Sequence, residues 1–178
     1  MKFRFFPFYI LGLFATCKQA RTNVNEHALI QPDTVAIASK LLTLADAEKI
    51  MGEQAKLTGN TFIKKGDTLE YKCDYTALSQ DAITSKIGRL YFMYEIYEGV
   101  AAAANAYADI YQANRGHEGV EVVSGLGNDA YYHSDQTGFY FFLVRKNEKM
   151  FRLKLNIITS HSSVTEFKEA TRRIVDKL

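Results

Sequence analysis

The sequence predicts an α+β fold, with a largely antiparallel sheet and helices packed on it. Segments with the two-residue apolar alternation of strands follow one another directly and are joined by short turns. Segments with a helical period occur as well, but they do not alternate strictly with strands as they do in a parallel sheet. The expected order of elements is α-β-β-β-α-β-β-β-β-α.

The first half is expected to hold a short helix, three strands and a longer helix. Thr43 is followed three residues later by Asp46, which is a capping pair, and Gly52 suits the residue that ends a helix. The expected elements are a helix at 44–51, strands at 61–64, 69–75 and 87–97 with a turn at 65–68, and a helix at 100–115.

Alternation assigns faces to these strands. Cys73 falls in the apolar set of residues 69–75, so its thiol should point to the apolar side. In residues 87–97 the set expected to face the core is Leu90, Phe92, Tyr94 and Ile96, and the opposite set is Tyr91, Met93, Glu95 and Tyr97. The longer helix should pack on the sheet through Val100, Ala104, Tyr107 and Tyr111.

The second half is expected to complete the sheet and end in a helix. Strands are expected at 120–123, 130–133, 138–145 and 151–157, with turns at 125–129 and 147–148. Residues 138–145 are almost wholly apolar, which indicates a central strand covered on both faces, whereas 151–157 alternate and should leave one face wet. A capping box from Ser163 to Glu166 precedes an amphipathic helix at 164–178 with an apolar stripe of Val164, Phe167, Thr171, Ile174 and Leu178.

The amino terminus has the pattern of a secretory signal peptide. Residues 1–16 combine a short basic start with about a dozen mostly apolar residues, too few for a spanning helix. The segment from Leu13 to Cys17 resembles the lipobox of bacterial lipoproteins, and this resemblance implies diacylation of Cys17 and anchoring in a membrane. The expected organisation is a signal peptide at 1–16, a lipidated tether at 17–39 and one domain at 40–178.

An exported lipoprotein would face the periplasm, and no acidic residue directly follows Cys17, which favours the outer membrane over the inner one. The alternative is an ordinary signal peptide cut near Ala15 or Ala20. In that case a disulfide between Cys17 and Cys73 becomes conceivable in an oxidising compartment.

The charge balance argues against a nucleic-acid partner. The chain has 22 Lys and Arg against 20 Asp and Glu, and because Lys2 and Arg4 belong to the leader, the mature part is neutral. A neutral domain lacks the general electrostatic footprint of a nucleic-acid binder.

No catalytic, metal or cofactor motif is evident, so we assign no catalytic residues, no metal and no cofactor. The four histidines, His27, His117, His133 and His161, are scattered without ligand spacing. Nothing selects an acid/base pair from Asp74, Glu95, Glu98, Asp129 and Asp135. Cys73 is expected to be a buried, inert thiol. Gly125-Leu126-Gly127 lacks the rest of a phosphate-binding motif and is expected to be a turn with positive φ.

Aromatic content is high, with eleven Tyr and twelve Phe. A groove for a ligand or partner could be lined by Tyr91, Met93, Tyr97, Tyr131 and Tyr140. The competing expectation is that a second helix layer covers these side chains.

Several segments together, ADAEKIMG, YKCDY, GLGNDAYY and FFLVRKN, resemble those of small exported bacterial lipoproteins with PsbP-like α+β domains. The resemblance implies a fold more than an activity. The leading hypothesis is a non-enzymatic envelope protein that binds a protein partner or small ligand. The alternatives are a motif-free, hydrolase-type enzyme and a purely structural or chaperone-like protein.

Overall fold

The computed structural model describes residues 36–178, so the expected signal peptide, Cys17 and most of the tether lie outside the described residues. The elements are α2 (Leu44–Met51), β1 (Ala55–Lys65), β2 (Thr68–Ala77), β3 (Arg89–Ile96), α3 (Val100–Asn114), β4 (Val120–Val122), β5 (Asp129–Ser134), β6 (Tyr140–Lys146), β7 (Lys149–Ile157) and α4 (Val164–Lys177). Their order is the predicted one.

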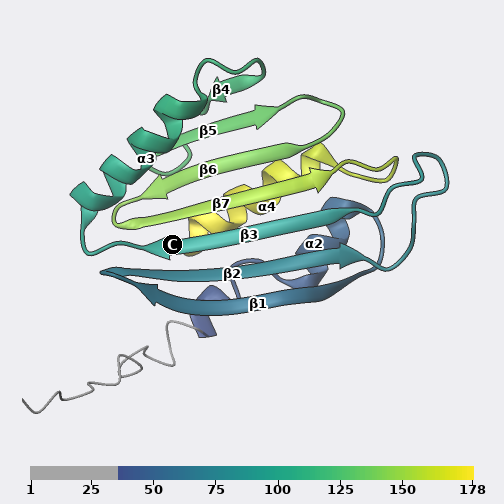
Figure 1. Cartoon of the computed structure of the whole chain (residues 1–178), viewed down its shortest axis with the longest axis horizontal. Coiled ribbons are helices and arrows are strands. Elements are labelled where there is room, and N and C mark those ends of the chain that lie inside the picture. Colours follow the sequence, from purple (N-terminus) through teal and green to yellow (C-terminus); the bar gives the residue numbers. More distant parts are fainter. Residues whose placement is uncertain (1–35) are drawn as a thin grey trace, which may run out of the picture.

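All strands in the described residues join one antiparallel sheet of seven strands, in the order β1-β2-β3-β7-β6-β5-β4. Strands β1 to β3 form one meander and β4 to β7 form a second, and β7 returns to pair with β3 at the middle of the sheet (Figure 1). The predicted α+β class with an antiparallel sheet is therefore confirmed.

Helices α2 and α4 lie on one face of the sheet, which we call the covered face (Figure 1). Both helices begin at the predicted caps: the side chains of Thr43 and Ser163 accept hydrogen bonds from backbone N–H groups in the first turn. Their apolar sides meet the inward-facing residues of the strands in one large core, whose largest aromatic members include Phe92, Phe151 and Phe167. Burial of this kind is the main source of stability for the domain.

Helix α3 lies on the opposite face, over β6 and β7, and forms a smaller core of Tyr107, Tyr131, Leu143 and Met150. The expected contact stripe was wrong at its start, since Val100 is 52% exposed and Ala103 is fully buried. Val100 is the first residue of the helix, directly after the Glu98-Gly99 turn, and the small Ala103 one turn later is the residue that faces the sheet.

Two other differences concern the first edge of the domain. Strand β1 begins at Ala55, six residues before the predicted start, because this edge strand carries polar and exposed residues that show no alternation. Buried side chains already begin at Ala38, and the hydroxyl of Tyr75 donates a hydrogen bond to the carbonyl of Leu42 at 3.0 Å.

Strand β6 has the predicted central character. Its residues from Phe142 to Arg145 are all buried, because α4 covers one of its faces and α3 the other. Strand β7 buries Phe151, Leu153 and Leu155 and leaves Arg152 and Lys154 partly exposed, which confirms the predicted wet face.

Candidate functional site

The α3 side of the sheet is only partly covered. Helix α3 lies over β6 and β7, and no described helix lies over β1, β2 and β3 on that side (Figure 1). A hollow with a volume of about 260 Å³ opens there, which we call the open-face groove. It is lined by the buried Phe92 and by the partly exposed residues Lys72, Asp74, Tyr91, Met93, Phe141, Arg152 and Lys154.

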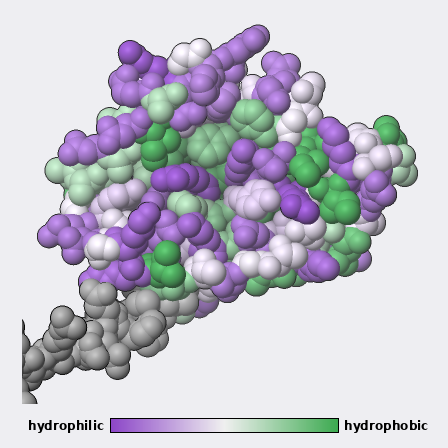
Figure 2. Space-filling model, in the orientation of Figure 1, coloured by the Kyte–Doolittle hydropathy of each residue, from purple (hydrophilic) through white to green (hydrophobic). Residues whose placement is uncertain are grey.

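Strand register explains why the floor of this groove is apolar and the residues around it are charged. Tyr91 on β3 lies opposite Asp74 on β2 and Lys154 on β7. Met93, two residues along the same face, lies opposite Lys72 and Arg152. Because directly opposite residues share a face, each apolar side chain is flanked by charged ones. Figure 2 shows this face with hydrophobic and hydrophilic residues interspersed.

Two of the surrounding cations are held by buried carboxylates. Lys72 pairs with Glu70 at 2.6 Å, and Arg152 pairs with Glu95 at 3.1 Å. Burial raises the pKa of Glu95 and outweighs the opposing effect of Arg152. The Nε of Arg152 is itself buried and has no hydrogen-bond partner among the described residues. The guanidinium therefore keeps an unused donor beside the groove.

A second hollow of about 430 Å³ continues the groove across β1 and β2, and shares Asp74 and Tyr91 with it. It adds Lys56 and Arg89 to the lining. Within residues 36–178 neither of these two cations, nor Lys154, forms an ion pair. Against these three, the joined hollows hold one unpaired carboxylate, Asp74, whose pKa is raised by burial. The surface therefore carries a net positive charge.

Two histidines that are far apart in the sequence lie together at the far end of the same face. The rings of His117 and His133 are 5.8 Å apart, and Phe139 packs edge-on against His133 at 4.8 Å. The Nζ of Lys154 lies 5.3 Å from the ring of Phe139. Burial and the neighbouring His117 lower the pKa of His133. The only signal in the sequence was the pair of strands predicted at 120–123 and 130–133. In the structure these strands pair so that Val120 lies opposite His133. His117, which lies just before β4, is thereby brought close to His133.

The structure brings together only part of the predicted aromatic set. Tyr91 and Met93 line the open-face groove, and Tyr97 packs beside the small core under α3. Tyr131 is 1% exposed and packs against Tyr107 and Tyr111, so a helix does cover it. A single groove lined by all five residues is therefore not formed.

Tyr140 is separated from the others by the sheet. Register pairs Tyr132 with Phe142, and Tyr140 is two residues from Phe142 on the same strand, so these side chains share the covered face. The ring of Tyr140 lies 5.7 Å from that of Phe167 on α4.

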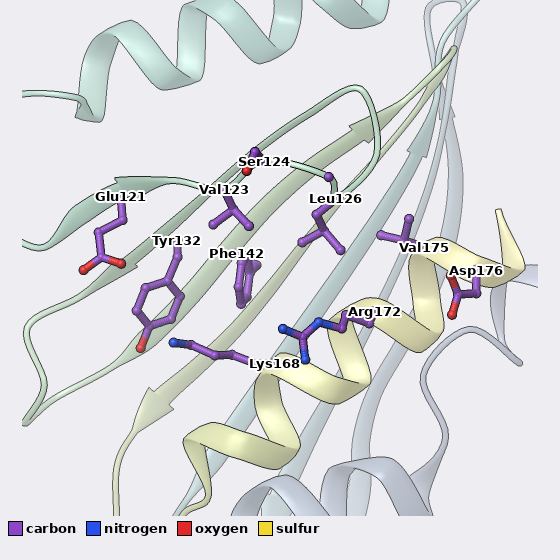
Figure 3. A pocket seen from close by; sticks show the side chains of 11 residues that line it. Glu121, Val123, Ser124, Leu126, Tyr132, Phe142, Lys168, Arg172, Val175 and Asp176 are labelled. Carbon is purple, nitrogen blue, oxygen red and sulfur yellow. The ribbon is translucent and has the colours of Figure 1, made fainter.

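A further hollow lies on the covered face at the border of α4, which we call the α4 cleft. Its volume is about 340 Å³. Helix α4 provides Lys168 and Arg172, and the sheet provides Tyr132 and Phe142. Figure 3 shows the two aromatic rings pointing from the sheet toward the two cationic side chains. The remaining lining residues are Glu121, Val123, Ser124, Gly125, Leu126, Val175 and Asp176.

The segment from Val123 to Leu126 forms one wall of this cleft. It runs into the turn predicted at 125–129, in which Gly125 and Gly127 have the predicted positive φ values, 73° and 68°. A side chain at Gly127 would collide with the carbonyl oxygen of Arg145. The close approach to β6 therefore requires glycine there.

The carboxylates named above as acid/base candidates do not converge. Asp129 pairs with Arg145, with a hydrogen bond from Arg145 Nε at 2.6 Å. Asp135 accepts hydrogen bonds from the backbone of its own turn, at Thr137, Gly138 and Phe139. Glu98 is exposed. No group of three His, Cys, Asp or Glu side chains that could hold a metal ion occurs in residues 36–178.

Cys73 lies in the core of the covered face and is fully buried, as alternation predicts. Burial raises the pKa of its thiol to about 11. A thiol in this state is a poor nucleophile near neutral pH.

None of the helices in the described part of the chain is long and apolar enough to cross a membrane. Comparison with protein-family models, with curated proteins and with solved structures found no match. The resemblance to PsbP-like lipoproteins therefore stays a prediction.

Proposed function

We propose that this chain is an exported envelope lipoprotein whose domain binds an acidic segment of another envelope protein at the open-face groove. One observation carries the binding role: the chain covers one face of its sheet with two helices and leaves much of the other face open, with an apolar floor among unpaired cations. Exposed apolar patches rimmed by polar residues are typical of interaction sites.

Charge complementarity defines the chemistry of the partner. Lys56, Arg89 and Lys154 have no counterion among the described residues, and Asp74 is the single opposing carboxylate in the groove that lacks a pair. Acidic side chains on a partner would supply these counterions, and this arrangement contributes to specificity and association rate. Tyr91, Met93 and Phe141 would receive an apolar or aromatic side chain of the same segment.

The shape of the site favours an extended polypeptide over a compact ligand. The two hollows share Asp74 and Tyr91 and together cross β1, β2, β3 and β7. Their cations are spread over those strands rather than gathered around one point, from Lys56 on β1 to Lys154 on β7. An extended chain can place successive acidic side chains along such a surface, whereas one small molecule reaches only part of it.

The enzyme hypothesis has less support. It predicts converging acid/base groups in a deep pocket. Two carboxylates on this face, those of Glu70 and Glu95, are cross-strand neighbours, but each forms an ion pair, Glu70 with Lys72 and Glu95 with Arg152. Neither carboxylate lines the open-face groove. This arrangement supports a structural role for the two pairs.

The anchor is tested by the intact mass of the mature protein from its host. We expect an amino-terminal Cys17 that carries acyl chains in the wild type, and loss of this mass in Cys17→Ala. An unmodified chain cut at another position would contradict the lipoprotein proposal and would leave the binding proposal to be tested separately.

The binding role is tested with two defined polymers, a random copolymer of Glu and Tyr and a random copolymer of Lys and Tyr. We expect the acidic copolymer alone to bind, with an affinity that falls as salt is added. Lys154→Glu should weaken binding about fivefold or more. The matched control is Lys65→Glu, an equal charge change at the exposed β1–β2 turn, which should have little effect. Equal binding of both copolymers, or equal effects of both variants, would contradict the proposal.

A further inference from the structure

We infer that the α4 cleft is a second, independent site, which binds a small anionic molecule with a flat apolar body, such as an aromatic carboxylate. This inference does not rest on the binding role proposed for the open-face groove, because the two sites lie on opposite faces of the sheet.

The cations of the cleft lack counterions. Lys168 and Arg172 are four residues apart on α4, so two like charges lie on the same side of the helix and repel each other. Neither side chain forms an ion pair or a hydrogen bond with another described residue. The other cations of this helix are engaged: Arg173 pairs with Asp46, and Lys177 donates a hydrogen bond to the carbonyl of Lys40.

The acidic residues of the cleft do not neutralise these cations. Glu121 on β4 and Asp176 near the end of α4 lie toward opposite ends of the cleft, with Lys168 and Arg172 between them (Figure 3). No ion pair links either carboxylate to Lys168 or Arg172. An anion bound between the two cations would relieve their mutual repulsion.

The floor of the cleft is aromatic. Tyr132 and Phe142 are both buried, and their rings are 5.1 Å apart. Val123, Leu126 and Val175 add aliphatic surface beside them. The Nζ of Lys168 lies 4.8 Å from the centre of the Tyr132 ring, so a cationic group already contacts this aromatic floor. A flat apolar body would fit on these rings while its anionic group meets Lys168 and Arg172 (Figure 3).

The size of the cleft limits the ligand. About 340 Å³ is near the lower end of the range of roughly 300 to 1,000 Å³ that is typical of small-molecule sites. One or two fused rings with a single carboxylate or sulfonate fit this volume. A polypeptide or a nucleic acid does not.

The test compares 2-naphthoate with its neutral analogue 2-naphthylmethanol, using the full mature chain and amide chemical shifts in NMR titrations. We expect 2-naphthoate to bind about tenfold more tightly than the alcohol and to shift the amides of residues 123–127. Lys168→Gln and Arg172→Gln should each weaken the binding of 2-naphthoate about fivefold and leave the binding of the alcohol unchanged. Lys65→Gln is the matched control, because it removes a cation outside the cleft. It should change the affinity for neither ligand.

A second variant keeps the test valid if the cation variants alter folding. Val123→Trp places a large side chain in the apolar wall and retains both cations, and we expect it to block both ligands in a protein with an unchanged fold. Equal affinities for the acid and the alcohol would overturn the inference. So would an absence of naphthoate binding at millimolar concentration, or shifts that map away from the cleft and survive these substitutions.

Discussion

The two faces of the sheet come from the same strands, yet one is closed by helices and the other is left largely open. On the covered face, Phe92, Phe142 and Phe151 are buried beneath or beside α2 and α4. On the other face, the residues next to Phe92 and Phe142 in sequence, Tyr91, Met93 and Phe141, remain partly exposed among charged side chains. The covered face accounts for most of the stability of the fold, and the open face is where binding can occur without unfolding the domain.

The largest expected effect comes from two neighbouring phenylalanines on β6. Phe142 faces the covered core, where its ring lies 5.8 Å from Phe167, whereas Phe141 faces the open side and is only partly buried. We expect Phe142→Ala to lower the free energy of unfolding by about 3 to 5 kcal/mol, and Phe141→Ala by about 1 to 2 kcal/mol. Urea unfolding of both variants measures the difference. Equal losses would contradict the assignment of faces.

A smaller loss is expected at the border between α3 and the open face. Glu95 is 6% exposed and pairs with Arg152, so Glu95→Gln leaves the guanidinium without its counterion. We expect a loss of about 2 kcal/mol, because one partner of a largely buried pair is removed while the other stays. Glu98→Gln, at an exposed carboxylate three residues later, is the control and should change the free energy of unfolding by less than about 0.5 kcal/mol. Similar losses in both variants would mean that the pair is not a structural contact.

Acid should weaken the contact between the β2–β3 loop and the loop that joins β7 to α4. The carboxylate of Asp81 accepts hydrogen bonds from the backbone and hydroxyl of Ser160, at 2.8 and 2.5 Å, and these bonds hold its pKa well below the usual value of 3.8. A lowered pKa stabilises the fold at pH values above 3.8, and this stabilisation is lost as the pH falls further.

We therefore expect Asp81→Asn to be less stable than the wild type by a constant amount between about pH 5 and pH 8, and the difference to shrink below about pH 4. Thermal unfolding across this range measures it. A difference in stability that grows toward low pH would contradict a lowered pKa of Asp81 in the folded protein.

The smallest expected change in stability belongs to the open-face groove itself. Met93→Ser removes part of the apolar floor without opening the core, so we expect a loss below about 1 kcal/mol. Binding of the Glu and Tyr copolymer should nevertheless fall severalfold in this variant. A large loss of stability would place Met93 in the core and would weaken the contrast between the two faces.

The predictable part of the structure was the part that a local pattern determines. The caps at Thr43 and Ser163 marked helix starts, alternation placed Cys73 in the core, and the apolar run in β6 indicated cover on both faces. The polar edge strand β1 has no such pattern, and its predicted first residue was therefore wrong.

The candidate sites depend on long-range packing, and most of their residues could not be predicted from the sequence. Tyr91 and Met93 were named from alternation, but their neighbours Arg152 and Lys154 come from a strand that pairs with β3 only through the overall topology. The same holds for the α4 cleft, where Tyr132 meets Lys168 only because α4 packs beside β5 and β6. No spacing in the sequence encodes these contacts.

The most direct test of the binding role is photo-crosslinking in the host's envelope from defined positions on the two faces. A photoreactive phenylalanine analogue replaces Tyr91 or Met93 in the open-face groove, or Thr165 or Glu169 on the exposed side of α4. We predict one discrete protein adduct from positions 91 and 93, reduced by Lys154→Glu, and none from 165 and 169. No adduct from the groove, or equal adducts from both faces, would contradict the proposal that the groove binds an envelope protein.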